Sequence, residues 1–126
     1  MEPADINGLT EQVIGCAIEV HRQTGPGLLE STYEQCLACE LRNRQIPHEL
    51  QKEMPISYKG LRLDCGYRTD ILVEGRLLVE LKAVEKLLAI HEAQLLTYMK
   101  LAEIKAGLLI NFNVRLLKDG IRRLVL

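Results

Sequence analysis

The sequence predicts an α/β protein in which a central mixed β-sheet is flanked by helices. Three segments place apolar residues at helical spacing, and between them lie strand-length runs of β-branched and aliphatic residues bounded by turn signals. The predicted order is two helices, three strands, one helix and one strand, and a short last stretch fits a further edge strand. With 126 residues, 48% of them hydrophobic, the chain fits one compact domain over residues 1–126.

The first two predicted elements are helices. The first covers residues 9–23, with apolar side chains at helical spacing at Leu9, Val13, Ala17 and Val20. The letters TGPG that follow end the pattern. The second helix is predicted to start at Glu30 or Ser31 and to end near residue 44, and Ser31 with Glu34 has the spacing of a capping box.

The next predicted elements are strands. The letters HELQKEMPISYKG predict an extended segment that ends in a turn at Lys59-Gly60, and LRLDCGYRTDILV predicts the returning strand. A turn at EG leads into the strand RLLVELKAV. A helix is then predicted from Ala89 to Glu103, followed by the apolar strand AGLLINFNV and the edge strand IRRLVL.

Asp70, Glu80 and Lys82 interrupt the apolar runs of the hairpin RTDILVEGRLLVELKAV. Burying a charge without a partner is costly, so their presence needs a reason. A three-residue loop would pair Leu72 with Arg76 and give the hairpin one polar face, made of Arg68, Asp70, Glu80 and Lys82. The opposite face would then be mainly apolar, with Tyr67, Thr69, Ile71, Leu77, Val79, Leu81 and Ala83.

The pattern of this polar face allows two interpretations. Two carboxylates on one face repel each other unless a proton or a cation lies between them, and oxygen ligands suit Mg²⁺ or Mn²⁺. Lys82 projects to the same side and could orient or deprotonate a water. Alternatively, Arg68 and Lys82 neutralise the acids in a salt-bridged face, because structural ion pairs also cluster in this way.

Two further groups of residues stand out. On the helix after the hairpin, Gln94 and Tyr98 share one face and His91 extends it, which predicts either a site-facing stripe or an ordinary polar flank. In the segment GLLESTY, Gly27, Glu30 and Tyr33 recur three residues apart.

Together these motifs resemble the GxxExxY family, a small branch of the PD-(D/E)XK nuclease superfamily. The resemblance is carried by GLLESTY with its flanks EVHRQTGPGLLESTYEQCLACELRNRQI, and by ELKAVEKLLAIHEAQLLTYMKL, GLLINFNV and KDGIRRLV. It spans residues 13–125 and implies a single nuclease-like domain with the superfamily's αβββαβ core. That core agrees with the order of elements predicted from the patterning.

The resemblance also implies a site. Asp70 is similar to the metal-binding aspartate, Glu80 and Lys82 to the ExK pair, and Glu30 to the acid of the first core helix. The implied metal ligands are Asp70, Glu80, Glu30 and the backbone carbonyl near Leu81. Gln94 and Tyr98 resemble a QxxxY element, and with His91 they would bind or orient the substrate. The implied activity is Mg²⁺- or Mn²⁺-dependent hydrolysis of phosphodiester bonds in DNA or RNA by a metal-activated water, and endo- and exonuclease action both remain open.

A second function class is a catalytically silent module that keeps the fold and binds a protein or a nucleic acid. The net charge of −1 argues against a general polyanion-binding surface. Because a short chain leaves little room for substrate recognition beyond the core, we expect a homodimer or a protein partner. No run approaches the ~20 apolar residues of a membrane span, and the first ten residues lack signal-peptide features, so the expected location is the cytoplasm.

The remaining candidates for chemistry are interpreted as structural. Cys36 and Cys39 form a CxxC pair, and Cys16 and Cys65 are scattered. A structural zinc needs four ligands in paired clusters, so buried thiols without a ligand are expected instead. His21 is expected to serve helix packing.

Overall fold

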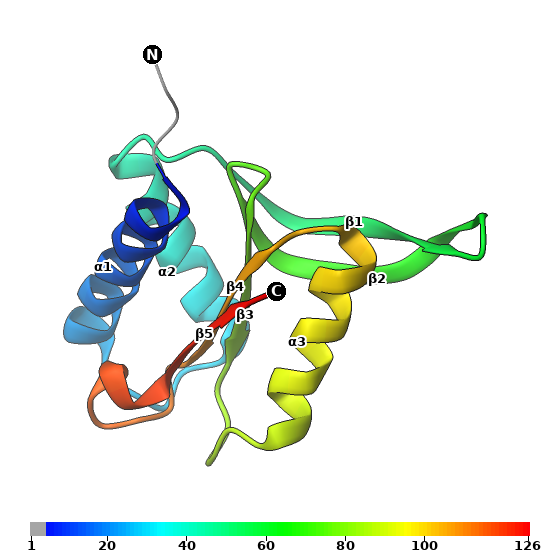
Figure 1. Cartoon of the computed structure of the whole chain (residues 1–126). Coiled ribbons are helices and arrows are strands. Elements are labelled where there is room, and N and C mark those ends of the chain that lie inside the picture. Colours follow the sequence, from blue (N-terminus) through cyan, green and yellow to red (C-terminus); the bar gives the residue numbers. More distant parts are fainter. Residues whose placement is uncertain (1–4) are drawn as a thin grey trace.

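The structure is a computed structural model that describes residues 5–126, apart from the side chains at positions 65 and 66, where the prediction for Cys65 lies. It confirms the predicted order and adds the last edge strand (Figure 1). The elements are α1 Ile6–Thr24, α2 Glu30–Asn43, β1 His48–Tyr58, β2 Leu61–Val73, β3 Leu77–Lys82, α3 Ala89–Ala102, β4 Ala106–Asn111, the 3₁₀ turn η1 Leu117–Gly120 and β5 Ile121–Val125.

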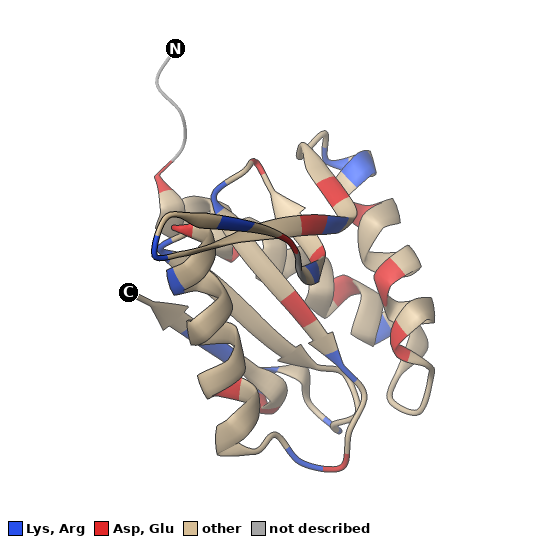
Figure 2. Ribbon diagram, turned by 90° about the vertical axis from the view of Figure 1, so that its right-hand side faces the viewer, with Lys and Arg blue, Asp and Glu red and all other residues tan. Residues whose placement is uncertain are grey.

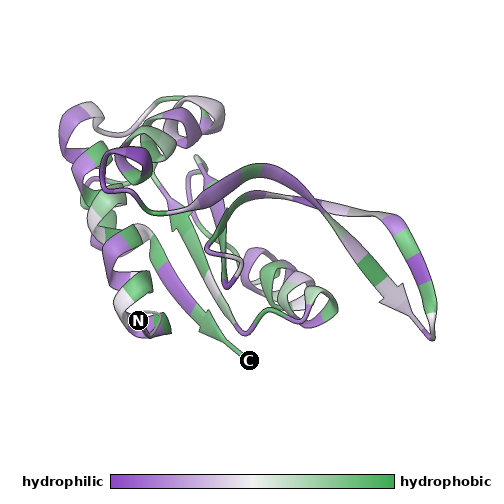
Figure 3. Ribbon diagram, turned by 90° about the horizontal axis from the view of Figure 1, so that it is seen from above, coloured by the Kyte–Doolittle hydropathy of each residue, from purple (hydrophilic) through white to green (hydrophobic). Residues whose placement is uncertain are grey.

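One five-stranded sheet, in the order β1-β2-β3-β4-β5, forms the centre of the fold. Only β3 and β4 run parallel, as expected for strands joined through α3, and the other neighbours are antiparallel. Helices α1 and α2 cover one face of the sheet and α3 covers the other (Figures 1 and 3). The sheet therefore divides the buried residues into two cores, called below the α1/α2 core and the α3 core. Within residues 5–126, no helix combines the length and the apolar character needed to cross a membrane.

The ends of the first two helices depend on short-range chemistry. Asp5 caps α1 by accepting a hydrogen bond of 2.6 Å from the Gly8 N–H, and Gly25 ends the helix with φ of 73°. The predicted capping box at the start of α2 is wrong. Leu29 holds the N-cap position without a side-chain bond, and the Glu34 carboxylate instead accepts a hydrogen bond from Gln51.

The hairpin of β2 and β3 keeps the predicted face but not the predicted register. Val73 pairs with Leu77 across a loop of residues 74–76, instead of Leu72 with Arg76. Both registers have the same parity, so the shift by two residues leaves Asp70 and Glu80 on the same face. Positive φ values at Glu74 (51°) and Gly75 (69°) allow the tight turn.

The long β1–β2 hairpin reverses its faces near its middle. In β1, Leu50 packs with the α1/α2 core and Met54 with the α3 core. In β2, Ile71 packs with the α1/α2 core and Tyr67 with the α3 core. The two residues of each strand are four apart, so a regular strand would place both on the same face. The reversal coincides with Gln51, whose φ of 50° is in the left-handed region. The predicted placement of Tyr67 on the same face as Ile71 is therefore wrong.

Beyond this point the hairpin extends past α3 (Figures 1 and 3). Its charges are interspersed along both strands (Figure 2), and several form short-range ion pairs. One of these joins Arg68 to Glu53 across the strands at 3.0 Å, with both side chains exposed. The pattern predicted that Arg68 lies with Asp70 and Glu80 on one polar face. This prediction is wrong, because Arg68 pairs with Glu53 instead.

Candidate active site

Two carboxylates occupy the place where β2 leaves β3. The pairing of these strands ends at Ile71 and Val79, so the following N–H groups of β3 lose their strand partner. The Leu81 N–H donates to Asp70 Oδ2 at 2.8 Å, and the Ala83 N–H donates to Glu30 Oε1 at 3.1 Å. Two side chains from different elements thus take over the hydrogen bonds that a strand would otherwise provide.

Glu30 is held there by the segment that leads into α2. Gly27 has a φ of 101°, which favours glycine, and α2 begins at Glu30. The buried Tyr33, one turn later, donates from its hydroxyl to the Gly25 carbonyl at 2.6 Å and accepts from the Leu28 N–H at 3.1 Å. The ring of Tyr33 also stacks on Phe112, with ring centroids 4.4 Å apart. At this spacing, Gly27 allows the turn before α2, Tyr33 holds the turn by hydrogen bonds, and Glu30 lies between them with its carboxylate near the end of β3.

Glu80 is the most perturbed acid of the site. Burial, followed by the charge of Asp70, raises the pKa of Glu80 to about 8. Lys82 and the Asp70 backbone N–H oppose this rise, and Glu30 adds to it. Among the described side chains, Glu80 Oε1 is a buried atom without a hydrogen-bond partner. The predicted acids thus act on one another, and Glu80 is neutral at pH 7.

Lys82 is half-buried beside these acids. Its charge acts on Glu80, but within residues 5–126 no ion pair within 4.0 Å joins Lys82, Asp70 or Glu80 to an opposite charge. A salt-bridged face would need such pairs, so the described side chains do not form the salt-bridged face that the sequence pattern also allowed.

A pocket of about 200 Å³ opens beside Asp70. It is lined by Glu30, Ser31, Glu34, Gln51, Asp70 and Leu81. Glu34 and Gln51 were not predicted as site residues. Glu34 lies one helical turn after Glu30 and so shares its face, which is a signal that the sequence does contain. Gln51 lies on a different strand and only the fold brings it near.

The predicted residues of α3 do not line this pocket, and two of them contact each other and β2. Gln94 Nε2 donates to the Tyr98 hydroxyl at 2.9 Å, and the Tyr98 ring stacks on Tyr67 with centroids 3.7 Å apart. Burial, together with Glu80, raises the pKa of Tyr67. His91 lies apart from this stack, because its Nδ1 accepts a hydrogen bond of 3.0 Å from the Leu88 N–H at the start of α3.

The donor set fits a hard divalent cation. Mg²⁺ commonly binds through one or two carboxylates and keeps several waters. Asp70 and Glu80 could supply the carboxylates. The Leu81 carbonyl faces the same gap as its N–H because both groups of a strand residue point to one side. Within the described part of the chain, no three His, Cys, Asp or Glu side chains are grouped closely enough to hold an ion by themselves. Waters would therefore complete the coordination.

Other candidate groups lie away from this site. His21 Nε2 contacts the carbonyls of Phe112 (3.2 Å) and Val114 (2.8 Å), which confirms a packing role. The thiol of Cys16 is buried, as expected, and burial raises its pKa. The other two described cysteines differ from the expectation: Cys36 is half-buried and Cys39 is exposed on α2.

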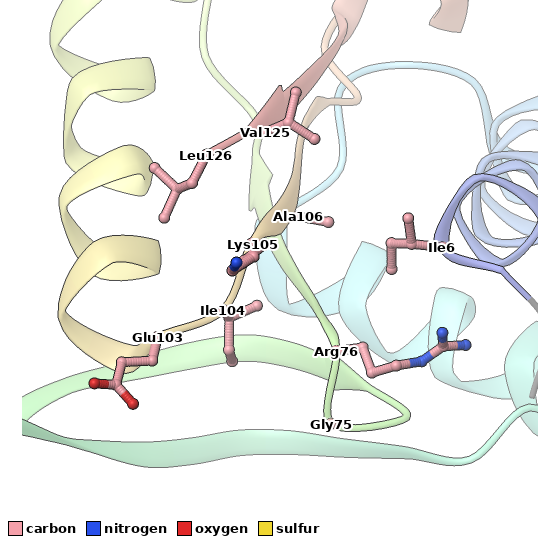
Figure 4. Close-up of a pocket in the computed structure, with 9 residues that line it drawn as sticks. All are labelled: Ile6, Gly75, Arg76, Glu103, Ile104, Lys105, Ala106, Val125 and Leu126. Atoms are coloured by element: carbon pink, nitrogen blue, oxygen red, sulfur yellow. The ribbon is translucent and has the colours of Figure 1, made fainter.

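A larger pocket, of about 370 Å³, lies at the opposite end of β3 and β4, where Ala106 begins β4 (Figure 4). Its lining is mainly apolar. Its one acid, Glu103, points away from the other lining residues, and Arg76 and Lys105 are its basic residues.

Comparison with known families gives one match. A family model described as the PD-(D/E)XK nuclease superfamily matches residues 7–124. Comparisons with curated proteins and with solved structures returned no match. The match covers nearly all of the described chain, and it indicates nuclease-like activity without assigning a metal or catalytic residues.

Proposed function

The chain belongs to the PD-(D/E)XK nuclease superfamily, and we propose that it is a Mg²⁺-dependent nuclease that hydrolyses phosphodiester bonds in DNA or RNA. The observation that carries this proposal is the set of acids where β2 leaves β3. Asp70 accepts from the Leu81 N–H of β3 and Glu30 from the Ala83 N–H just after β3, and Glu80 is buried with an unpartnered oxygen. Such a buried acid costs stability, and perturbed acids of this kind cluster at functional sites.

In this proposal Asp70, Glu80 and the Leu81 carbonyl would hold the ion. Glu30 would reach it through a water, because among the described residues no three acids are grouped closely enough to bind one ion together. When bound, Mg²⁺ polarises the scissile phosphate and lowers the pKa of a water. The hydrogen bonds from Leu81 and Ala83 fix one oxygen of Asp70 and one of Glu30 in advance. Glu80 would bind the ion as a carboxylate, so binding would release its proton to the solvent.

Lys82 would position the attacking water through its ammonium group, since it is the cation whose charge acts on Glu80. It could take the proton of that water only as a neutral amine. The Gln94–Tyr98 pair, braced against Tyr67, orients Lys82 or contacts the phosphate backbone. His91 would affect the substrate only through the start of α3, which it caps.

Within the superfamily, we place the chain in the GxxExxY family. The support is that Gly27, Glu30 and Tyr33 act as one unit: a left-handed glycine, a carboxylate directed at β3 and a buried tyrosine that pins the loop. This unit explains physically why the three residue types occur at that spacing.

A silent binding module is the second candidate, and one observation favours it. Asp70 and Glu30 already satisfy backbone N–H groups, so both acids would keep a structural use without any reaction. In such a module Lys82 would affect stability alone. A protein partner or a second copy of the chain would then carry the function.

The test is metal-dependent cleavage of single- and double-stranded DNA and RNA with Mg²⁺ or Mn²⁺, with metal binding measured by calorimetry. Lys82→Ala should abolish cleavage and leave metal binding largely intact, since a lysine is no ligand for a hard cation. Asp70→Ala and Glu80→Ala should lose both properties. Gln94→Ala and Tyr98→Phe should lose activity in part.

The matched control is Lys86→Ala, which removes an exposed lysine from the loop just after β3. It should cleave like the wild type. A wild type that cleaves none of the four substrates with either metal, while it binds one of them or a protein, would replace the nuclease proposal with the silent module.

A further inference from the structure

Gln51 has a backbone conformation that a strand interior rarely contains. Its φ of 50° lies in the left-handed region, which costs a residue with a Cβ some free energy. Within residues 5–126 the other non-glycine residues with positive φ lie in turns or just after helices, at Gln45, Lys59, Glu74 and Glu103. Gln51 alone among them lies within a strand. Strain of this kind persists where the surrounding contacts require it, and it often marks a functional site.

The contacts of the Gln51 side chain supply the reason. Its Nε2 forms a short hydrogen bond to Glu34 Oε1 and also faces Asp70 Oδ1 at 3.4 Å. The carboxylates of two elements, α2 and β2, therefore converge on one amide nitrogen. An amide NH₂ group carries two hydrogens, so it can serve both acceptors at once.

The two acids need such a group between them. Glu34 is buried, and both burial and the charge of Asp70 disfavour its ionised form, whereas the Gln51 hydrogen bond favours it. Asp70 in turn also acts on Glu80. A carboxylate with an acid neighbour on each side could bridge two ions, which in two-metal sites lie about 3.5–4 Å apart.

We propose that Gln51 is a positioning residue whose amide occupies the place between Glu34 and Asp70 that a second cation would otherwise take. The pocket then binds one divalent ion, shared by Asp70 and Glu80, and the amide holds the other oxygen of Asp70. The inference rests on the proposed function in one respect, because it assumes a cation at Asp70.

The first test is the number of Mn²⁺ ions bound per chain, measured by calorimetry and by electron paramagnetic resonance. The wild type should bind one. Gln51→Glu replaces the donor by a carboxylate of the same shape and should bind two. Gln45→Glu alters an exposed glutamine with φ of 58°, outside the pocket, and should bind one. Two ions in the wild type, or one ion in Gln51→Glu, would overturn the inference.

The second test uses the metal-free chain. Glycine relieves left-handed strain, so Gln45→Gly should keep or raise the melting temperature. Gln51→Gly relieves the same strain but removes the donor from two acids, and its melting temperature should fall by about 3 °C or more. Equal increases of the melting temperature in both variants would show that the Gln51 amide does not stabilise Glu34 and Asp70.

Neither test measures cleavage, so failure of the inference and failure of the proposed function are distinguishable. A wild type that binds one Mn²⁺ but cleaves no substrate would refute the proposed nuclease activity and leave the proposed role of Gln51 unaffected. A wild type that binds no Mn²⁺ would overturn both the metal-dependent function and the single-ion pocket.

Discussion

Replacing Glu80 by glutamine should make the metal-free protein more stable at alkaline pH. Folding raises the pKa of Glu80 from 4.5 to about 8, so the folded state holds a proton that the unfolded state has released. The sign follows directly: wild-type stability is fully present below pH 4.5, falls as the pH rises towards 8 and then levels off. Each pH unit in this interval costs about 1.4 kcal/mol. Between pH 5 and pH 8 the free energy of unfolding should therefore drop by about 3 kcal/mol.

Glutamine has nearly the same shape and does not titrate, so Glu80→Gln should lose this pH dependence. The assay is urea unfolding at pH 5 and pH 8 in the presence of a chelator. The two proteins should be of similar stability at pH 5, and the variant should be more stable by about 3 kcal/mol at pH 8. Glu53→Gln, which alters an exposed acid paired with Arg68, should follow the wild type. A variant that parallels the wild type across this range would refute the buried, proton-holding Glu80.

Three further predictions follow from the same structure. Millimolar Mg²⁺ or Mn²⁺ near pH 7 should raise the wild-type melting temperature by about 5 °C, because a ligand that binds the folded state stabilises it by mass action. The same metals should leave the melting temperature of Asp70→Asn unchanged. Tyr33→Phe should lower the free energy of unfolding by about 1–2 kcal/mol in urea titrations, since the Gly25 carbonyl loses its donor; an unchanged value would contradict the pinned loop. Gly120→Ala should cost about 3 kcal/mol, because a Cβ there would lie 2.1 Å from the Asn111 carbonyl oxygen; a calorimetric melt like that of the wild type would disprove this crowding.

Most of the fold could be predicted from the sequence because turn signals separate the elements and several of them carry a clear apolar pattern. Helical spacing identified α1, the Lys59-Gly60 turn fixed the tip of the long hairpin, and the family model confirms the superfamily. The register of the β2–β3 hairpin was less well determined. Registers that differ by two residues bury the same face, so the pattern alone separates them poorly.

The site residues that follow the alternation of a strand could be predicted from the sequence. Those that depend on an unusual backbone conformation could not. Asp70 and Glu80 were placed on one face by parity alone. The left-handed conformation of Gln51 has no sequence signal, since glycine and asparagine are the usual residues there. Glu34 was assigned to a helix cap because the same spacing from Ser31 serves that role, and only its contact with Gln51 shows otherwise.

The gap between β2 and β3 has a consequence for the sheet itself. In an ordinary ladder, an amide proton is shielded from solvent exchange by a neighbouring backbone, whose bonding capacity never changes. At the end of β3, the amide protons of Leu81 and Ala83 are instead bound by the side chains of Asp70 and Glu30. Exchange of these two protons therefore depends on two side chains staying in place, and local opening of this strand end is coupled to any movement of the two carboxylates.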